Sequence, residues 1–208
     1  MKVLELFSGT HSVGKVCKEL GHDVVSLDLA GADININILD WDYKKDYKPG
    51  DFDCIWSSPP CETFSNCRRC WIGRKLKHFG DEIVTAKMLD DDMEKNGLPI
   101  LRKTEEIIKY FNPNRWVIEN PSTGKMKNYL KHLPHYDTDY CRYSDYGYKK
   151  PTRFWTNKEG FVALKCNGHC DNMTGSKHNQ LLARVNDDGG RLNARYRVPQ
   201  KIIKELLS

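Results

Sequence analysis

The N-terminal segment constrains the fold more than any other stretch, because it alternates between strand-like and helix-like patterns. Apolar residues at 3–7 predict a buried strand, and residues 23–28 predict a second one. Between them, Gly9 lies in a turn, and a helix is expected from Ser12 to a stop at Gly21. A strand, a glycine turn, a helix and a strand in this order form a βαβ unit. That unit implies a parallel sheet with a right-handed crossover, so the sequence predicts an α/β fold.

Later segments continue the same pattern. Short strands are expected within 32–41, 52–57 and 116–118, further extended pieces near 138–143 and 153–156, and a helix at 100–111 after Pro99. Residues 62–97 lack sustained periodicity apart from a helical turn near 88–93. A connection of that length inside a compact domain is usually a functional lid or disordered. With 208 residues, the chain is expected to form one domain with a proper core.

The charge balance is mildly basic, with 33 Lys and Arg against 28 Asp and Glu, for a formal charge of +5. This excess permits a polyanionic partner without requiring one. The N-terminus is too short and too charged for a signal peptide, and no apolar run approaches membrane-spanning length. We therefore expect no membrane partner and an intracellular location, either the cytoplasm or, for a viral protein, the host cell or virion. The eight cysteines are expected to be reduced or metal-bound.

Cys61 follows the strand expected at 52–57 and the pair Pro59-Pro60. The two prolines stiffen the chain as it leaves the sheet, so the thiol is held just beyond the carboxyl end of a strand. Open α/β sheets bind ligands at that edge, which favours a nucleophile. A free cysteine also fills apolar cores, so plain packing in a tight turn stays open at this point.

The turn around Gly9 also suits a ligand. Gly9 lets the backbone approach a bound group closely, and free N–H groups at the start of the next helix favour an anionic group such as a carboxylate. Asp28 ends the second strand, where a carboxylate grips ribose hydroxyls in folds of this kind. The turn lacks the GxGxxG and Walker lysine patterns, so a tight turn without a ligand is the alternative.

Five short motifs occur in order over nearly the whole chain. They are Phe7-Ser8-Gly9 with Gly14, Pro59-Pro60-Cys61, Glu119-Asn120-Pro121, Tyr146-Gly147-Tyr148-Lys149-Lys150-Pro151-Thr152-Arg153, and Val198-Pro199 before a final helix. In this order and at these spacings they resemble the motifs of the DNA cytosine-5 methyltransferase family. The compact phage- and virus-type members of that family are the most similar.

The resemblance implies a class I S-adenosylmethionine-dependent methyltransferase fold, which is Rossmann-like with a mainly parallel sheet, a reversed last strand and a small recognition lobe. It implies S-adenosylmethionine as cofactor, S-adenosylhomocysteine as product and double-stranded DNA as partner, with the target cytosine flipped into the pocket. We expect a monomer or a weak dimer. The alternatives are an RNA cytosine-5 methyltransferase acting on tRNA and a non-catalytic nucleic-acid-binding homologue.

The same resemblance implies three catalytic residues. Cys61 would attack C6 of the cytosine as a thiolate and form a transient covalent adduct. Glu119 would hydrogen-bond N3 and the exocyclic amine, and its protonated form would draw electrons away from C6. Arg153 would hold O2 of the base and, with the basic residues after Cys61, favour the thiolate.

Binding residues are also carried over from the resemblance. For the cofactor they are Phe7, Ser8, Gly9, Thr10, His11, Ser12, Asp28, Asp40 and Pro59. For the DNA substrate they are Pro60, Ser65, Asn120, Arg68, Arg69 and Arg184. Asp28 would take the ribose and Asp40 the adenine amine, with Asp33 or Asp42 as alternatives to Asp40.

Two positions depart from the family pattern. Glu62 stands where the family usually has Gln, which puts an acid where a polyanion approaches. Arg195-Tyr196-Arg197 stand where Gly-Asn usually precedes Val-Pro. The resemblance therefore implies no cofactor contact at these three residues.

The expected domains are a catalytic part at 1–156, a small target-recognition segment at 157–192 and a C-terminal helix at 193–208 that returns to the catalytic part. Few residues in so short a segment can reach base edges, so we expect it to read a short DNA site. The candidates for contacting DNA are Lys177, His178, Gln180 and Arg184.

Several cysteines have spacings that suit zinc, namely Cys67 with Cys70, and Cys166 with His169 and Cys170. Neither half is a complete four-ligand set, and the halves lie far apart in the sequence. Surface or half-buried thiols are the favoured interpretation. We therefore expect no metal, and a zinc site on these five residues is the alternative.

Overall fold

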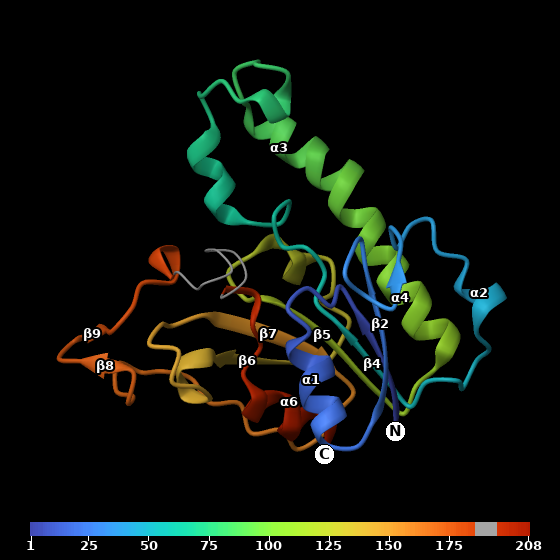
Figure 1. Ribbon diagram of the computed structural model, residues 1–208. Coiled ribbons are helices and arrows are strands. Elements are labelled where there is room, and N and C mark those ends of the chain that lie inside the picture. Colours follow the sequence, from blue (N-terminus) through green and yellow to red (C-terminus); the bar gives the residue numbers. More distant parts are fainter. Residues whose placement is uncertain (186–194) are drawn as a thin grey trace.

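A central sheet of seven strands organises the structure, a computed structural model that describes residues 1–185 and 195–208 (Figure 1). Across the sheet the strands follow the order β3-β2-β1-β4-β5-β7-β6. Their bounds are β1 (Lys2–Leu6), β2 (Asp23–Asp28), β3 (Ile34–Asn35), β4 (Cys54–Ser57), β5 (Arg115–Pro121), β6 (His135–Asp139) and β7 (Pro151–Thr156). A separate hairpin consists of β8 (Met173–Thr174) and β9 (Lys177–His178).

Strand directions confirm the expected sheet, which is mainly parallel with one reversed strand near its end. β1 runs parallel to β2 and to β4, and β4 runs parallel to β5. β7 lies antiparallel between β5 and β6. The chain order reverses between β1 and β4, and at such a point the carboxyl ends of the strands leave a crevice for ligands. The turns that carry Gly9 and Cys61 leave the sheet at this crevice.

Helices cover both faces of the sheet (Figure 1). α1 and α6 pack on one face, and α2 and α4 pack on the other. Successive side chains of a strand point to opposite faces, so Val3 of β1 contacts the first layer, whereas Leu4 and Leu6 contact the second. The helices are α1 (Ser12–Glu19), α2 (Tyr43–Asp46), α3 (Ala86–Asp92), α4 (Leu98–Phe111) and α6 (Gln200–Leu207), with one π-helical turn, η3 (Met93–Gly97). Short 3-10 turns are η1 (Asn66–Trp71), η2 (Lys77–Phe79), η4 (Lys125–Asn128), η5 (Tyr140–Arg142) and η6 (Leu182–Arg184).

One long helix, formed by α3, η3 and α4, projects beyond the sheet (Figure 1). The sequence predicted only its second half and a single turn before it, because Pro99 resembles a helix start. Thr85 begins the helix, and its side chain accepts a hydrogen bond of 3.2 Å from the backbone N–H of Met88. The π-helical turn lies just before Pro99, where the proline ring crowds the preceding turn and lacks an N–H. This local widening lets the helix continue through the proline.

After β7 the described chain forms loops, the β8–β9 hairpin and η6, which lie beside the β6 edge of the sheet (Figure 1). Backbone contacts hold them there: Asp139 donates its N–H to the Leu164 carbonyl at 3.1 Å. Part of the expected recognition segment, residues 186–192, lies outside the described residues, as do residues 193–194. Among the described residues, no helix is long and apolar enough to cross a membrane.

Candidate active site

Cys61 lies half-buried just past the carboxyl end of β4, on the turn that Pro59 and Pro60 begin. Pro59 is buried, and its carbonyl accepts a hydrogen bond of 2.8 Å from Nδ2 of Asn120 at the end of β5. This bond ties the ends of two neighbouring strands together. The thiol is therefore held at the edge of the sheet where ligands bind in such folds.

Glu119 is buried on β5, with only 6% of its surface exposed. Its Oε1 accepts a hydrogen bond of 3.0 Å from the Tyr140 hydroxyl and lies 3.6 Å from Nζ of Lys150. Lys150 is also buried, and its Nζ lies 4.8 Å from the centre of the Tyr140 ring. A buried charge is tolerated only when it is paired and hydrogen-bonded. Glu119, Tyr140 and Lys150 thus form one polar group, the Glu119 group.

The charges around Cys61 act on its thiol in opposite directions. Burial raises the pKa of Cys61, and the Glu119 carboxylate raises it further. Lys150 opposes both effects and lowers the same pKa. In the β4–β5 pairing Ser57 lies opposite Ile118, and Asn120 contacts Pro59, so the turn of Cys61 and Glu119 lie at the same edge of the sheet. Cys61 therefore adjoins the Glu119 group, and Lys150 is the cation that favours its thiolate.

Arg153 is not brought to Cys61 and Glu119. On β7, Phe154 lies opposite Glu119 and Arg153 lies opposite Asn120, so the guanidinium is on the other face of the sheet. There its Nε and Nη2 donate to the two oxygens of Asp137 at 2.6 and 2.8 Å. The cation expected beside the thiol is Lys150, and Arg153 forms a two-point ion pair between β7 and β6.

The turn after β1 has an unusual backbone. Phe7, Gly9 and His11 have φ angles of 60°, 46° and 54°, all in the left-handed region. Oδ2 of Asp28 accepts the N–H of Gly9 at 2.8 Å, and Nε2 of His11 lies 2.8 Å from the Gly31 carbonyl. Residues other than glycine adopt positive φ angles only where the surrounding structure enforces them, and such backbone strain is concentrated at ligand sites.

A cavity of about 980 Å³ opens beside this turn. Gly9, Thr10 and Ser12 line one side of it, and Val198 lies across from them. The Oγ of Ser12 accepts the N–H of Val198 at 3.2 Å, so the closing Val-Pro motif reaches the turn despite its altered neighbours. Cys61 and Glu119 do not belong to the described lining of this cavity.

Ser8 supplies a test of whether a ligand fits here. Its hydroxyl oxygen is buried and has no hydrogen-bond partner among the described residues. A buried polar atom normally has a partner, so an unpaired one next to a strained turn and a cavity fits a bound polar group. The turn residues are therefore suited to hold a cofactor with a polar end.

The aspartates predicted to bind the cofactor differ in their hydrogen bonds within the protein. Asp28 accepts backbone N–H groups with both oxygens, from Gly9 and from Leu29. Asp33 accepts the N–H and the hydroxyl of Ser26 at 2.8 and 2.6 Å, and these bonds hold its pKa below the usual range. Asp40 is exposed after β3, as is Asp42. Both of these bonds from Ser26 use the Oδ2 of Asp33, and the adenine contact stays predicted for Asp40, with Asp33 or Asp42 as alternatives.

Arg68, predicted to bind DNA, is instead buried within the segment between β4 and α3. Its Nη2 pairs with the carboxylate of Asp92, and its Nη1 donates to the Thr63 carbonyl at 3.3 Å. The guanidinium also lies 5.1 Å from the centre of the Trp71 ring. A guanidinium enclosed in this way cannot reach a phosphate, so Arg68 fastens the segment to the long helix.

The other predicted DNA contacts are placed differently. Pro60 and Arg69 are exposed. The Oγ of Ser65 accepts the N–H of Cys67 at 3.2 Å and so caps η1. The side chain of Arg184 lies outside the described residues. Contact of Pro60, Ser65, Arg69 and Arg184 with DNA stays a prediction.

Three buried residues with polar side chains were not predicted from the sequence. Lys150 stands inside the motif that ends at Arg153, so its position in that motif was an available signal. Glu5 was also detectable, because it is an acidic residue within an apolar strand. Its side chain is buried, and burial raises its pKa to about 7. The backbone N–H groups of Gly14 and Val13 act in the opposite direction and lower that pKa. No pattern in the sequence marks Tyr140.

The chain is 47% identical over 220 residues to a protein of frog virus 3 (isolate Goorha) described as a "Probable DNA (cytosine-5)-methyltransferase", with 100% of this chain and 99% of that protein covered. No family model matches the chain.

Solved structures show weaker similarity. The S. pombe Dnmt2 methyltransferase is 14% identical with a TM-score of 0.47, covering 78% of this chain and 53% of that one. The Entamoeba histolytica methyltransferase EhMeth is 11% identical with a TM-score of 0.44, covering 90% of this chain and 60% of that one. The chain thus spans between 53% and 60% of the length of these two proteins. The strand order carries the fold assignment, and the full-length identity to the viral protein shows that the chain belongs to the DNA (cytosine-5)-methyltransferase family.

Proposed function

We propose that the protein transfers a methyl group from S-adenosylmethionine to C5 of cytosine in double-stranded DNA, through a covalent bond between Cys61 and C6 of a flipped base. The observation that carries this proposal is the grouping of Cys61, Glu119 and Lys150 at the ends of β4 and β5, set by the β4–β5 register, the Asn120–Pro59 hydrogen bond and the Lys150–Glu119 contact. A nucleophile, a proton donor and a cation in one place are what addition to an electron-poor ring requires.

The first step is activation of the thiol. Burial and Glu119 raise the pKa of Cys61, so its thiol is largely protonated before substrate binds. Lys150 favours loss of that proton. The thiolate then forms a bond from sulfur to C6. The electron pair of the C5–C6 double bond shifts towards C4, and that of the C4–N3 double bond shifts onto N3, which takes a proton from the carboxyl group of Glu119.

The second step makes C5 a nucleophile. S-adenosylmethionine, when bound, supplies the electrophilic methyl group that C5 takes up. Loss of the C5 proton to solvent water then returns an electron pair to the C5–C6 bond and expels the Cys61 thiolate. N3 gives its proton back to Glu119, which frees the methylated base and restores the starting state of the site. Tyr140 and Lys150 hold Glu119 in place throughout, since both contact its Oε1.

The cofactor would be held by the turn after β1 and by its neighbours. The Ser8 hydroxyl, which has no partner in the described part of the chain, suits the polar methionine end, as do the backbone around Gly9 and the start of α1. Asp28 and Asp40 remain the proposed partners of the ribose and the adenine amine. Val198 closes the turn through its contact with Ser12.

Methylation sequencing tests the reaction in cells that express the wild type, Cys61→Ser or the control Cys67→Ser, which changes an exposed cysteine. We expect 5-methylcytosine in DNA from the wild type and from Cys67→Ser, and only background with Cys61→Ser. Methylation that survives Cys61→Ser would contradict the covalent mechanism. Purified tRNA, tested beside duplex DNA, separates the substrates: transfer to tRNA alone would overturn the assignment to DNA.

A further inference from the structure

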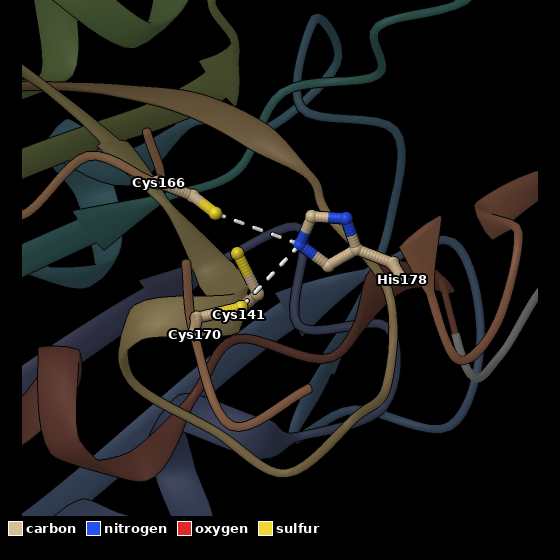
Figure 2. Close-up of side chains that lie close together, drawn as sticks. All are labelled: Cys141, Cys166, Cys170 and His178. Carbon is tan, nitrogen blue, oxygen red and sulfur yellow. Dashed lines mark hydrogen bonds between the residues drawn. The ribbon is translucent and has the colours of Figure 1, made fainter. Parts of the chain in front are cut away.

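Four metal-ligating side chains meet at the base of the β8–β9 hairpin (Figure 2). They are Cys141, Cys166, Cys170 and His178, and their sulfur and nitrogen atoms all lie within 4.8 Å of one another. Nε2 of His178 is 3.6 Å from Sγ of Cys166 and 3.5 Å from Sγ of Cys170. In Figure 2 the three sulfurs and this nitrogen face a common centre.

Hydrogen bonds alone do not explain the arrangement. An imidazole nitrogen carries either one proton or one lone pair in the plane of the ring, so Nε2 cannot make two good hydrogen bonds to two sulfurs. A central cation removes this difficulty, because every ligand then points at the same ion. With Zn–S near 2.3 Å and Zn–N near 2.0 Å, a tetrahedron sets each sulfur about 3.5 Å from the nitrogen. The two separations at His178 match that value.

The surrounding backbone holds the ligands in place. The loop between Cys166 and Cys170 turns at Gly168, whose φ of 94° disfavours any other residue. The N–H of Cys166 donates to Oδ2 of Asp139 at 2.8 Å. Nδ2 of Asn172 donates to the carbonyl of Cys141 at 2.8 Å, which joins the loop to η5. These bonds bring three separate segments to one point.

We propose that Cys141, Cys166, Cys170 and His178 bind one structural zinc ion. Three thiolates and one neutral imidazole complete a four-ligand tetrahedron with no open position, which is typical of zinc that stabilises a fold. Binding replaces the thiol protons, so the ion must be held by deprotonated cysteines. The ion would fasten residues 166–178 to the end of β6.

The proposed ion also lies close to the candidate active site along the chain. Cys141 directly follows Tyr140, whose hydroxyl donates to Glu119. Lys149 donates to the carbonyl of Cys166 at 3.1 Å and directly precedes Lys150. The zinc site is thus joined to two members of the Glu119 group through residues next to them in the chain.

This set differs from the one expected from sequence spacing. Cys67 and Cys70 are exposed on η1, and among the described residues they join no group of three or more metal ligands. His169 lies between two ligands, and its carbonyl accepts a hydrogen bond of 3.0 Å from Nη1 of Arg142. Among the described residues its side chain joins no group of three or more metal ligands. These three residues are matched controls for the proposal.

Metal analysis and X-ray absorption of the purified full-length protein test the proposal directly. We expect about one zinc per chain, with three sulfurs near 2.3 Å and one nitrogen near 2.0 Å. Zinc below about 0.2 equivalents after growth and purification without chelators would overturn it. A disulfide among Cys141, Cys166 and Cys170, found by non-reducing peptide mass spectrometry, would overturn it as well.

Variants give a second arm that does not depend on methylation. Cys170→Ser and His178→Ala are expected to lose zinc to a competing chelator at least about 10-fold more readily than the wild type. Cys67→Ser, Cys70→Ser and His169→Ala are expected to retain zinc as the wild type does. Equal retention in both sets, or loss with Cys67→Ser, would contradict the assigned ligands. The absorption measurement on the wild type decides the matter if a ligand variant fails to fold.

Discussion

Lys150 and Arg153 lie three positions apart in one motif, yet β7 and the turn before it give them different surroundings. Lys150 contacts Glu119 and acts on Cys61, whereas Arg153 pairs with Asp137 across the β6–β7 ladder. Arg153 also holds the pKa of Asp137 below its usual range, mainly through their hydrogen bonds. The two cations should therefore affect different measurements when they are removed.

Removing Lys150 should change the pH profile of the reaction. Since Lys150 lowers the pKa of the Cys61 thiol, Lys150→Met leaves that pKa higher, and the rising limb of kcat/KM moves to higher pH. We expect at least about a 10-fold loss of kcat/KM at neutral pH.

Arg153→Met is the matched comparison. It should leave the position of the pH profile unchanged and lower the free energy of unfolding by about 1–3 kcal/mol, because Asp137 loses a two-point charged partner. A profile that moves with Arg153→Met and stays fixed with Lys150→Met would reverse the two assignments.

Glu5 predicts a pH dependence of stability. Burial raises its pKa from an ordinary 4.5 to about 7, so between these values the folded chain keeps a proton that the unfolded chain has lost. The folded state then binds more protons, and the wild-type free energy of unfolding falls as pH rises from 4.5 to 7 through this residue. Glu5→Gln removes that dependence.

The free energy of unfolding of Glu5→Gln should therefore exceed that of the wild type only slightly near pH 4.5. The difference should grow until about pH 7, to an upper limit on the order of 3 kcal/mol. Denaturant unfolding at several pH values measures it. Glu82→Gln, at an exposed position, is the control and should show no such trend. A constant difference between Glu5→Gln and wild type across this range would refute the account of Glu5.

At the scale of elements, the π-helical turn before α4 fits against the loop that carries Cys61. Gly97 faces that loop: a Cβ built on it would collide with Oγ1 of Thr63 and come within 3.1 Å of the Phe64 ring. Glycine to alanine in a helix normally stabilises by about 1 kcal/mol. Here the collision should outweigh that gain.

Gly97→Ala is therefore expected to destabilise the fold by about 1–3 kcal/mol and to lower methyl transfer, because Thr63 and the turn of Cys61 must move. Thermal melting and initial rates measure the two effects. Lys95→Ala, exposed on the same turn, should stay within about 0.5 kcal/mol of the wild type. A stabilised and fully active Gly97→Ala would show that the loop and the helix are not coupled.

The segment between β4 and α3 supplies a prediction about DNA binding. Arg69 is exposed there, whereas its neighbour Arg68 is buried against Asp92. If Arg69 meets a phosphate, Arg69→Ala should weaken duplex binding equally for all sequences and reduce the salt slope of log K by about one. Arg68→Ala should instead lower the melting temperature. An unchanged salt slope for Arg69→Ala would remove Arg69 from the DNA contact surface.

At the scale of the whole molecule, local periodicity predicted the elements that are long and regular. The βαβ unit at the N-terminus, the strand before Cys61 and the helix ending at Phe111 were all expected near their observed positions. These elements could be predicted from the sequence because the spacing of apolar residues and the glycine that ends a helix are local patterns within one element. The third strand, only Ile34–Asn35, is too short to be bounded by such a pattern.

What the sequence did not reveal depends on contacts between distant segments. The face of the sheet on which Arg153 lies follows from its pairing register with β5, and no local pattern sets that register. The meeting of Cys141 with His178 likewise requires the fold of the intervening chain. The helix through Pro99 was missed because the compensating π-helical turn has no sequence signature of its own.

The central claim is that Cys61 bonds to C6 of a cytosine in DNA, and covalent trapping tests it most directly. Duplex DNA with 5-fluorocytosine as the target, together with S-adenosylmethionine, should arrest the reaction, because fluorine at C5 cannot leave as the proton does. Peptide mass spectrometry is then predicted to find the DNA adduct on Cys61 and none with Cys61→Ser. An enzyme that methylates ordinary cytosine DNA but forms no adduct, or forms it on another cysteine, would contradict the account.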